Sequence, residues 1–315
     1  MNTTAQPPLP TNIPEYLEHL RRSLAGADPA LIQDALYDAE EYLRSELAEN
    51  PGKTEAEVIA QVASSYGAPE EVADIYRDTE VKVQTALRTP PSRPRRSVFG
   101  KFFGVVAEPR TYAALFYMLL SLATGVFYFT WVVTGISLSI GLAVLIIGIP
   151  FAILFFGSVR MLSLLEGRIV EVMLGERMPR RPLYSNRGKP LMARIGELFA
   201  DPRNWSSMLY MLLMLPLGIV YFTIAVTLLS LSLSFILAPI MVWLGIATMG
   251  AGSGDWMYFT IENGVLFSSL GIMALPLMLV LGVLMLFGTL HVARGIGYMH
   301  GQFAKRLLVK SAQYG

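Results

Sequence analysis

The chain divides into a region of short amphipathic segments and two long apolar blocks. Between residues 13 and 87, apolar side chains recur every three or four positions among acidic ones, which predicts three or four short helices. From Thr111 to Val159 there is no Asp, Glu, Lys or Arg, over about twice the ~20 residues that cross a bilayer. A second block, from Asn204 to Ala293, contains no Lys or Arg. We therefore expect an all-α protein: a small helical bundle followed by a polytopic α-helical membrane domain.

Capping residues mark the ends of the short helices. Asn12 and Asp28 are expected N-caps, and Thr54 with Glu57 fits a capping box for a third helix. Gly67 suits the left-handed conformation that ends many helices. These signals predict one small domain with a solvated acidic face.

The two apolar blocks begin with copies of the same sequence. The first copy starts at Glu108 with EPRTYAALFYMLLSLATGVFYFTWVVTGISLS, and the second starts at Asp201 with DPRNWSSMLYMLLMLPLGIVYFTIAVTLLSLS. They align without a gap at an offset of 93 residues, and 16 of the 32 positions are identical. Further on, Arg168 matches Arg294 at an offset of 126, so the second copy carries about 33 extra residues. We expect two hairpins of two spans each, arranged as parallel repeats about an axis along the membrane normal.

The expected plan has five parts: a disordered start at 1–12, a helical domain at 13–87, a Pro- and Arg-rich linker at 88–98, a first membrane repeat at 99–180 and a second at 181–310. The four spans are expected near 112–134, 138–159, 205–228 and 267–290, with an insertion at 229–266. Thr134-Gly135 and Gly141 would allow a tight turn between the first two spans. The insertion is expected to be re-entrant, interfacial or extended outward, because a fifth span would place the basic C-terminal tail outside.

Charged residues set the expected orientation. Nine Lys and Arg lie between residues 160 and 203, whereas residues 229–265 contain none. By the positive-inside rule, both termini should face the cytoplasm of a bacterial inner membrane. Residues 1–87 carry 6 Lys or Arg against 16 Asp or Glu, a net charge of −10, and residues 88–315 carry 19 against 8, a net charge of +11. The N-terminus lacks the early apolar run of a signal peptide.

Composition supports a membrane protein and excludes some chemistry. Hydrophobic residues make up 53% of the chain and charged residues only 16%, against roughly 25% charged residues in soluble domains. The absence of cysteine excludes disulfides, thiolate metal sites and cysteine nucleophiles. The pattern offers no converging catalytic groups or metal ligands, so we expect a non-enzymatic protein without metal or cofactor.

Each copy carries the same polar pattern on its first span. One face holds tyrosine and glycine at helical spacing: Tyr117, Gly125 and Tyr128 in the first copy, and Tyr210, Gly218 and Tyr221 in the second. The opposite face holds hydroxyls: Thr130 and Thr134, repeated as Thr223 and Thr227. These residues favour close helix packing, and they could also line a ligand or lipid cleft between the repeats. Both interpretations stay open.

The remaining candidates lie near the ends of the spans. Asp255 and Glu262 could bind a cation or act as acid and base, but solvated loop charges are the simpler interpretation. Trp256 suits the outer interface. Four arginines are expected to reach the inner lipid headgroups: Arg110, Arg168, Arg203 and Arg294.

The N-terminal region resembles a known signalling module. The segments IPEYLEHLRRSLAG and SSYGAPEEVADIYR, with the acidic helix between them, resemble the HAAS signalling domain over roughly residues 13–78. The resemblance implies a protein-interaction role, because this module occurs in bacterial membrane proteins often paired with PadR-type transcription regulators.

Residues 99–310 resemble the bacterial "Putative sensor" domain, a four-helix membrane domain that heads some sensor histidine kinases. The resemblance is carried by the span starts RTYAALFYMLL and RNWSSMLYMLL, by LLEGRIVEVMLG and by LHVARGIGYMHGQFAKRLL. Only seven residues follow Leu308, without kinase domains, so the resemblance implies an output that passes through another protein.

These observations predict a bacterial membrane signalling protein. The membrane part would sense a membrane-associated or apolar signal, and residues 13–87 would relay it to a cytoplasmic PadR-type transcription regulator or kinase. The expected partners are this regulator and the lipid bilayer, direct nucleic-acid binding is not expected, and homo-oligomerisation stays open. Two alternatives remain: a small transporter or lipid-handling protein that uses the repeat interface, and a membrane-embedded enzyme.

Overall fold

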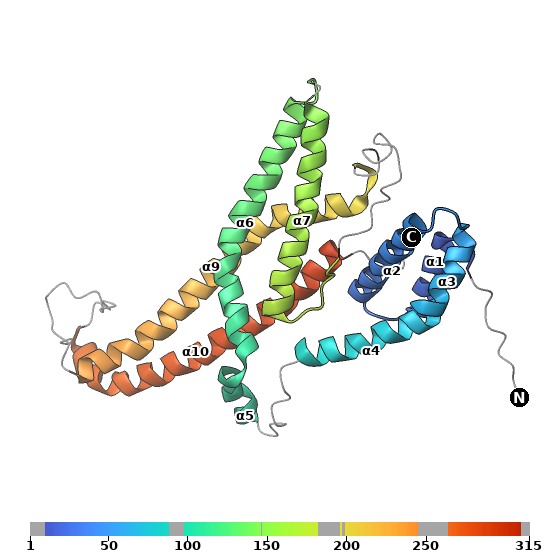
Figure 1. Ribbon diagram of the computed structural model, residues 1–315. Helices are drawn as coiled ribbons and strands as arrows, with labels where there is room; N and C mark the ends of the chain where they lie inside the picture. The colour runs from blue at the N-terminus through green and yellow to red at the C-terminus, as the bar shows by residue number, and fades with distance from the viewer. Residues whose placement is uncertain are drawn as a thin grey trace, which may run out of the picture. The chain divides into compact units, whose positions relative to one another are not determined.

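The computed structural model describes residues 10–87, 98–145, 147–181, 196, 199–244 and 264–309. Every regular element within these residues is helical, so the predicted all-α fold is confirmed (Figure 1). The described residues form two compact units. The first contains residues 10–87, those of 129–212 and residues 300–309, and the second contains residues 98–128 and those of 213–299.

The N-terminal domain consists of four helices: α1 (Ile13–Ser23), α2 (Pro29–Glu49), α3 (Glu55–Ser65) and α4 (Pro69–Leu87). The predicted caps are confirmed. The side chains of Asn12 and Asp28 each accept a hydrogen bond from a backbone N–H in the first turn of the following helix. Thr54 and Glu57 form both halves of a capping box, and Gly67 has the expected positive φ of 119°.

The amphipathic helices bury their apolar stripes in one core. Tyr16, Leu20, Leu43, Ile59 and Val72 are fully or almost fully buried there. The hydroxyl of Tyr16 donates a hydrogen bond to the carbonyl of Gly67 at 2.8 Å, so the buried phenol is satisfied. The four helices therefore have a common core within the first 87 residues.

The start of this domain differs from the prediction. Residues 1–12 were expected to be disordered, but the backbone N–H and the hydroxyl of Thr11 both donate to the Glu15 carboxylate at 2.8 Å. Ordered structure therefore begins before α1. Residues 1–9 and the linker residues 88–97 lie outside the described residues.

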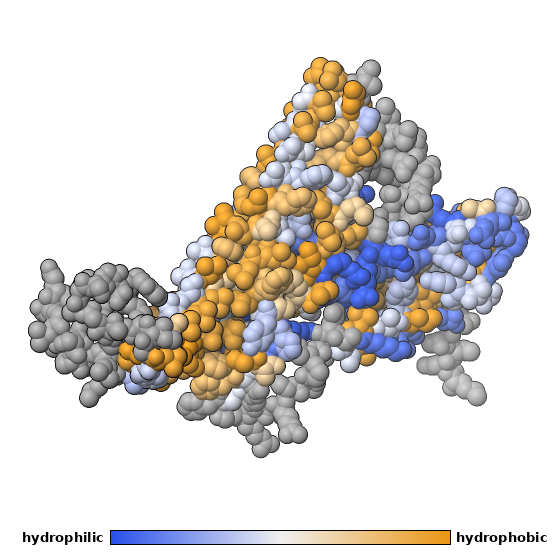
Figure 2. All heavy atoms as spheres, turned by 60° about the vertical axis from the view of Figure 1, so that its left-hand side comes forward, coloured by the Kyte–Doolittle hydropathy of each residue, from blue (hydrophilic) through white to orange (hydrophobic). Residues whose placement is uncertain are grey.

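Four long apolar helices follow: α6 (Pro109–Gly141), α7 (Gly148–Leu174), α9 (Pro202–Trp243) and α10 (Gly264–Leu308). Each has the length and composition to span a membrane, α10 from Leu275 onward. Large apolar side chains such as Phe116 and Leu154 are exposed along them, and Figure 2 shows apolar surface over these helices. Continuous exposed apolar surface marks a membrane-facing protein. The chain is therefore a multi-pass membrane protein.

Of the glycines expected at the turn between the first two spans, Gly141 lies at the end of α6, whereas Thr134-Gly135 lies inside the helix, so the turn comes later than the expected span bounds. Helix α6 continues to Gly141, and the turn includes residues 142–145 and Ile147. Gly135 serves packing instead, because a Cβ atom at this position would collide with the ring of Phe155 on α7. Beside it, the indole N–H of Trp131 donates to the hydroxyl of Ser158 at 2.9 Å. The glycine lets the two helices of the hairpin approach closely.

The insertion in the second repeat extends the helix of the third span. Residues 229–243 continue α9 without a break, although Pro216 and Pro239 lie inside it. Its 42 residues correspond to about 63 Å, roughly twice the hydrocarbon thickness of a bilayer. Residues 229–243 therefore extend the third-span helix, and the side of the membrane on which they lie stays a prediction. Residues 245–263 lie outside the described residues.

The two copies of the repeat contact each other through equivalent positions. A Cβ atom at Gly125 on α6 would collide with the carbonyl oxygen of Met214 on α9, and a Cβ at Gly218 would collide with that of Ser121. Adding 93 to 121 and 125 gives 214 and 218, so these are one contact seen from both copies. Such reciprocity is what a local two-fold axis produces. The direction of that axis relative to the membrane stays a prediction.

A short helical segment precedes the first span. It consists of α5 (Val98–Phe103) and the 3-10 helix η1 (Gly104–Ala107). The ring of Phe102 stacks on that of His291 at a centroid distance of 5.3 Å, and a ring nitrogen of His291 lies 3.0 Å from the carbonyl of Phe102. This contact attaches the segment to α10.

We predict that Gly125→Leu and Gly218→Leu each lower the stability of the detergent-solubilised protein, by about 1–3 kcal/mol, because neither backbone can yield without separating α6 from α9. Thermal unfolding measures the effect. Gly157→Leu is the matched control, since nothing lies within 4 Å of a Cβ at Gly157. Equal destabilisation by all three substitutions would contradict the contact.

Candidate functional site

A polar segment links the first membrane hairpin to the N-terminal domain. Helix α7 ends at Leu174 and is capped by Gly175, whose φ of 77° is in the left-handed region, and residues 176–181 then contact α2. We call residues 176–181 the junction segment. Arg177, Met178 and Pro179 within it are buried. The segment is therefore a packed part of the structure rather than a solvated loop.

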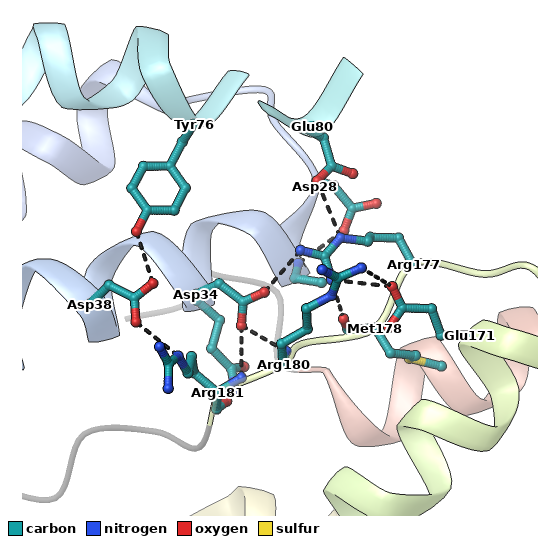
Figure 3. A network of polar contacts seen from close by, with 12 residues as sticks. Asp28, Asp34, Asp38, Tyr76, Glu80, Glu171, Arg177, Met178, Arg180 and Arg181 are labelled. Carbon is teal, nitrogen blue, oxygen red and sulfur yellow. Dashed lines mark hydrogen bonds and ion pairs between the residues drawn. The ribbon is translucent and has the colours of Figure 1, made fainter. Parts of the chain in front are cut away.

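Arg177 is the centre of this junction. Its Nη2 atom donates to Asp34 Oδ2 at 2.9 Å, and its Nε atom donates to Glu80 Oε2 at 3.2 Å. Its Nη1 atom donates to the carbonyl of Met178 at 2.5 Å and lies 3.6 Å from Glu171 Oε1. Figure 3 shows the guanidinium between carboxylates from α2, α4 and α7. One side chain thus contacts two helices of the N-terminal domain and the end of a membrane helix.

Asp34 binds the backbone of the junction segment as well. Its Oδ1 atom accepts hydrogen bonds from the backbone N–H groups of Arg180 and Arg181, at 2.7 and 2.9 Å. The side-chain amide of Gln33 donates to the carbonyl of Arg181 at 2.9 Å. The Arg181 side chain pairs with Asp38 at 2.9 Å. Helix α2 therefore fixes both the backbone and the side chains of the segment.

The charges of this network balance. Four carboxylates meet four guanidinium groups: Asp34, Asp38, Glu80 and Glu171, with Arg168, Arg177, Arg180 and Arg181. Burial opposes the charge of Arg177, but the surrounding carboxylates outweigh it and raise the pKa of the guanidinium. Burial raises the pKa of Asp34, although the N–H groups of the segment and Arg177 act against this shift. Removing Arg177 would leave buried carboxylates without compensation.

The last membrane helix joins the same junction. The ammonium group of Lys305 on α10 pairs with Asp28, the N-cap of α2, at 2.5 Å. The side-chain amide of Gln302 donates to Glu176 of the junction segment at 2.9 Å. The N-terminal domain therefore contacts the ends of both α7 and α10.

A second buried polar cluster lies at the same ends of the membrane helices. The hydroxyl of Tyr210 on α9 donates to Glu166 on α7 at 3.0 Å and lies 3.0 Å from a ring nitrogen of His300 on α10. All three residues are almost completely buried. A buried carboxylate requires such partners. This cluster ties α7, α9 and α10 together within the first unit.

The tyrosine and glycine candidates are mostly buried, but they do not form one site. Gly125 and Gly218 mark the contact between α6 and α9, and Tyr117 and Tyr128 are buried on α6. Tyr221 is half-buried beside a small apolar cluster of α6, α9 and α10. Tyr210 belongs instead to the cluster with Glu166 and His300. The threonine candidates are exposed, so they are not part of the repeat interface: Thr130, Thr134, Thr223 and Thr227.

The charged candidates behave differently from one another. Arg168 pairs with Glu171 at 2.9 Å, and Arg294 pairs with Glu108 at 2.7 Å, so both have protein partners in addition to any lipid contact. Arg110 is half-buried, and Arg203 lines a cavity described below. Asp255, Trp256 and Glu262 lie outside the described residues.

Sequence reasoning missed the junction. Its residues were interpreted as a solvated acidic face and as basic loop residues that set topology. The sequence feature that could have predicted the junction is the uneven charge distribution, because an N-terminal domain of net charge −10 attracts a basic segment elsewhere in the chain. Which arginine would be buried could not be deduced, since Asp34 and Arg177 are 143 residues apart. Glu166 and His300 carried no local signal.

We predict that Arg177→Gln loosens the junction by about 3 kcal/mol or more, because it leaves buried carboxylates unpaired. Hydrogen exchange of the junction segment and of α2 in the full-length protein measures this. Arg22→Gln is the matched control: the Arg22–Glu18 pair keeps side-chain exposures of 72% and 46%, against 8% for Arg177, and should change protection by less than about 0.5 kcal/mol.

Acidification separates charge from packing in this test. A carboxyl group whose pKa is raised in the folded state contributes stability below its unfolded pKa and loses it as pH rises through the folded pKa. Asp34 already has a raised pKa, and loss of the guanidinium raises it further. Lowering the pH from about 7 to about 5 should therefore restore part of the protection in Arg177→Gln. Identical protection of the variant and the wild type at both pH values would contradict the role of Arg177.

Comparisons with known proteins agree with this architecture. The family model described as HAAS matches residues 15–75, and the family model described as Putative sensor matches residues 117–308. Neither a search of curated proteins nor a search of solved structures returned a match. The two families confirm both resemblances and support a sensor or signalling role in general. Because the sensor model covers more than half of the chain, the protein belongs to the Putative sensor family and carries a HAAS domain before its membrane helices.

Proposed function

We propose that the protein is a non-enzymatic bacterial membrane sensor that passes a signal from its membrane helices to a cytoplasmic regulator through its HAAS domain. The signal would be a membrane-associated or apolar molecule, or a state of the bilayer. The regulator would be a PadR-type transcription regulator or a kinase. Both termini would face the cytoplasm of the inner membrane, in keeping with the basic residues of the junction segment and of the C-terminal tail.

The junction carries this proposal. Arg177 connects Asp34 and Glu80 of the HAAS domain to Glu171 at the end of α7, and Lys305 connects Asp28 to α10. A displacement of either membrane helix would therefore alter contacts of α2 directly. Hydrogen-bonded ion pairs have few acceptable geometries. A small shift of a membrane helix would therefore either leave the junction segment bound to α2 or release it, rather than deform the contact gradually.

The spans themselves favour a mechanical signal. The described segments of α6 and α7 between Thr111 and Val159 contain no ionisable Asp, Glu, Lys or Arg that could move charge across the bilayer. Helix displacement is the remaining route along these two helices. The transporter alternative would need an open interface between the repeats. At Gly125 and Gly218 the backbones of α6 and α9 are in contact, which leaves no room for a ligand at that crossing.

The test captures the partner in the native host. The full-length protein is crosslinked in cells and purified, and the captured proteins are identified beside transcript profiles. We expect a regulator that is captured through residues 1–87 and lost when they are deleted. Arg177→Gln should still capture it, because the core of the HAAS domain is intact, but the transcript profile should no longer respond to the signal. Arg22→Gln should behave as wild type.

Two results would contradict the proposal. If deletion of residues 1–87 left both the captured regulator and the transcript profile unchanged, the HAAS domain would not be the output. If Arg177→Gln responded as wild type while the deletion abolished output, partner binding would stand, but the junction would not be the relay.

A further inference from the structure

A small cavity lies between the HAAS domain and the ends of the membrane helices, all within the first compact unit. Its volume is about 50 Å³, room for about four water-sized groups. A phosphate group, with four oxygens around one atom, has this size. The polar lining comes from α2, α7, α9 and the residue that precedes α9: Gln33, Arg160, Ser163, Asp201, Arg203, Asn204 and Ser207.

The side chain of Arg203, which lines the cavity, has a donor without a hydrogen-bond acceptor. Its Nη1 atom is buried and has no hydrogen-bond partner. A guanidinium group has five N–H donors, and a buried donor on a charged group that stays unpaired is costly. Native proteins rarely keep such a group without a ligand, ion or water to satisfy it. An acceptor in the cavity would remove this cost.

The charges around Arg203 specify an anion. Arg160 is already satisfied, because it pairs with Asp201 at 3.0 Å and donates to Asn204 at 2.9 Å. Asp201 also accepts a hydrogen bond from the backbone N–H of Arg203. Asp201 is thus bonded to the Arg160 guanidinium and to the Arg203 backbone, while the charges of Asp201, Arg160 and Arg21 all act on the Arg203 guanidinium. The lining keeps an excess positive charge that a phosphate group would neutralise.

The arrangement around Arg203 is not repeated at the equivalent position around Arg110. Arg110 corresponds to Arg203 at the offset of 93, but the position that corresponds to Arg160 at the offset of 126 is Leu286. Glu108, which corresponds to Asp201, pairs with Arg294 instead. Arg203 therefore has a second arginine, Arg160, beside it, whereas the equivalent position for Arg110 is a leucine. This difference provides a control inside the same molecule.

We propose that this cavity binds a phosphate group, carried either by an anionic phospholipid headgroup or by a free phosphate ion. Arg203 would donate to the phosphate oxygens, with the second amide N–H of Gln33 and the hydroxyl of Ser207 as neutral donors. Arg203, Asn204 and Ser207 of the lining lie in the first turns of α9, before its long apolar run, where headgroups are expected. Gln33 also contacts the junction segment through Arg181, so occupancy would act on the junction. That last step alone depends on the proposed function.

The test uses the full-length protein in nanodiscs. One arm compares phosphatidylcholine nanodiscs with nanodiscs that also contain phosphatidylglycerol, and native mass spectrometry counts the retained anionic lipid. The other arm titrates inorganic phosphate into phosphatidylcholine nanodiscs and follows thermal unfolding. Retention of phosphatidylglycerol without an effect of phosphate identifies a headgroup site. Stabilisation by phosphate identifies a site for the free ion. Absence of both overturns the proposal.

Variants locate the binding. Arg203→Gln should weaken binding about tenfold or more, because it removes the charge-assisted hydrogen bonds to the phosphate. Arg203→Lys, which keeps the charge but loses the fork of donors, should bind with intermediate strength. Arg110→Gln should bind as wild type. If Arg110→Gln lost as much binding as Arg203→Gln, general attraction to headgroups would explain the result and the cavity would not.

The two proposals can fail separately. If Arg203→Gln lost phosphate binding without any change in the transcript profile, the cavity would remain the binding site, but its coupling to the junction would be contradicted. A wild-type protein that bound neither probe would overturn the site, while partner capture through residues 1–87 would be unaffected.

Discussion

The burial of one guanidinium group against three carboxylates organises this protein. Arg177 lies between Asp34, Glu80 and Glu171, and its side chain is almost completely removed from solvent. A buried ion pair contributes little net stability compared with apolar packing, but breaking one side of it is costly. Such a contact therefore specifies one arrangement rather than strengthening the fold as a whole. This is the property that a junction between a membrane domain and a signalling domain requires.

The membrane helices depend on a different constraint, the close approach of backbones. Lipid supplies no hydrophobic force between helices, so association relies on packing and on polar contacts between them. Gly125 and Gly218 provide the packing through one contact repeated by the two copies. Tyr210, Glu166 and His300 provide a polar contact at the helix ends beside the junction. The residues shared by the two copies thus hold the membrane helices together. Arg160 and Arg177, which have no arginine at the equivalent positions of the second copy, belong to the candidate cavity and to the junction.

Local signals in the sequence were sufficient for much of the fold. The caps at Asn12, Asp28 and Thr54 and the four apolar spans follow from short-range patterns. The turn was misplaced because glycine marks both turns and close helix contacts, and Gly135 serves the second purpose. The junction could not be predicted, since the ion pairs that join Arg177 to the N-terminal domain connect residues more than 90 positions apart. Periodicity cannot distinguish a buried arginine from the exposed arginines beside it.

The central claim is that the HAAS domain is held against the ends of α7 and α10 in the membrane-embedded protein. The chain contains no cysteine, so Asp28→Cys with Lys305→Cys introduces a single pair. The Asp28–Lys305 pair is replaced, and the contacts of Arg177 remain. A short bis-maleimide applied to native membranes should join the two cysteines efficiently, and adding Arg177→Gln should reduce the product. An absence of crosslinking while Arg177 is present would contradict the account.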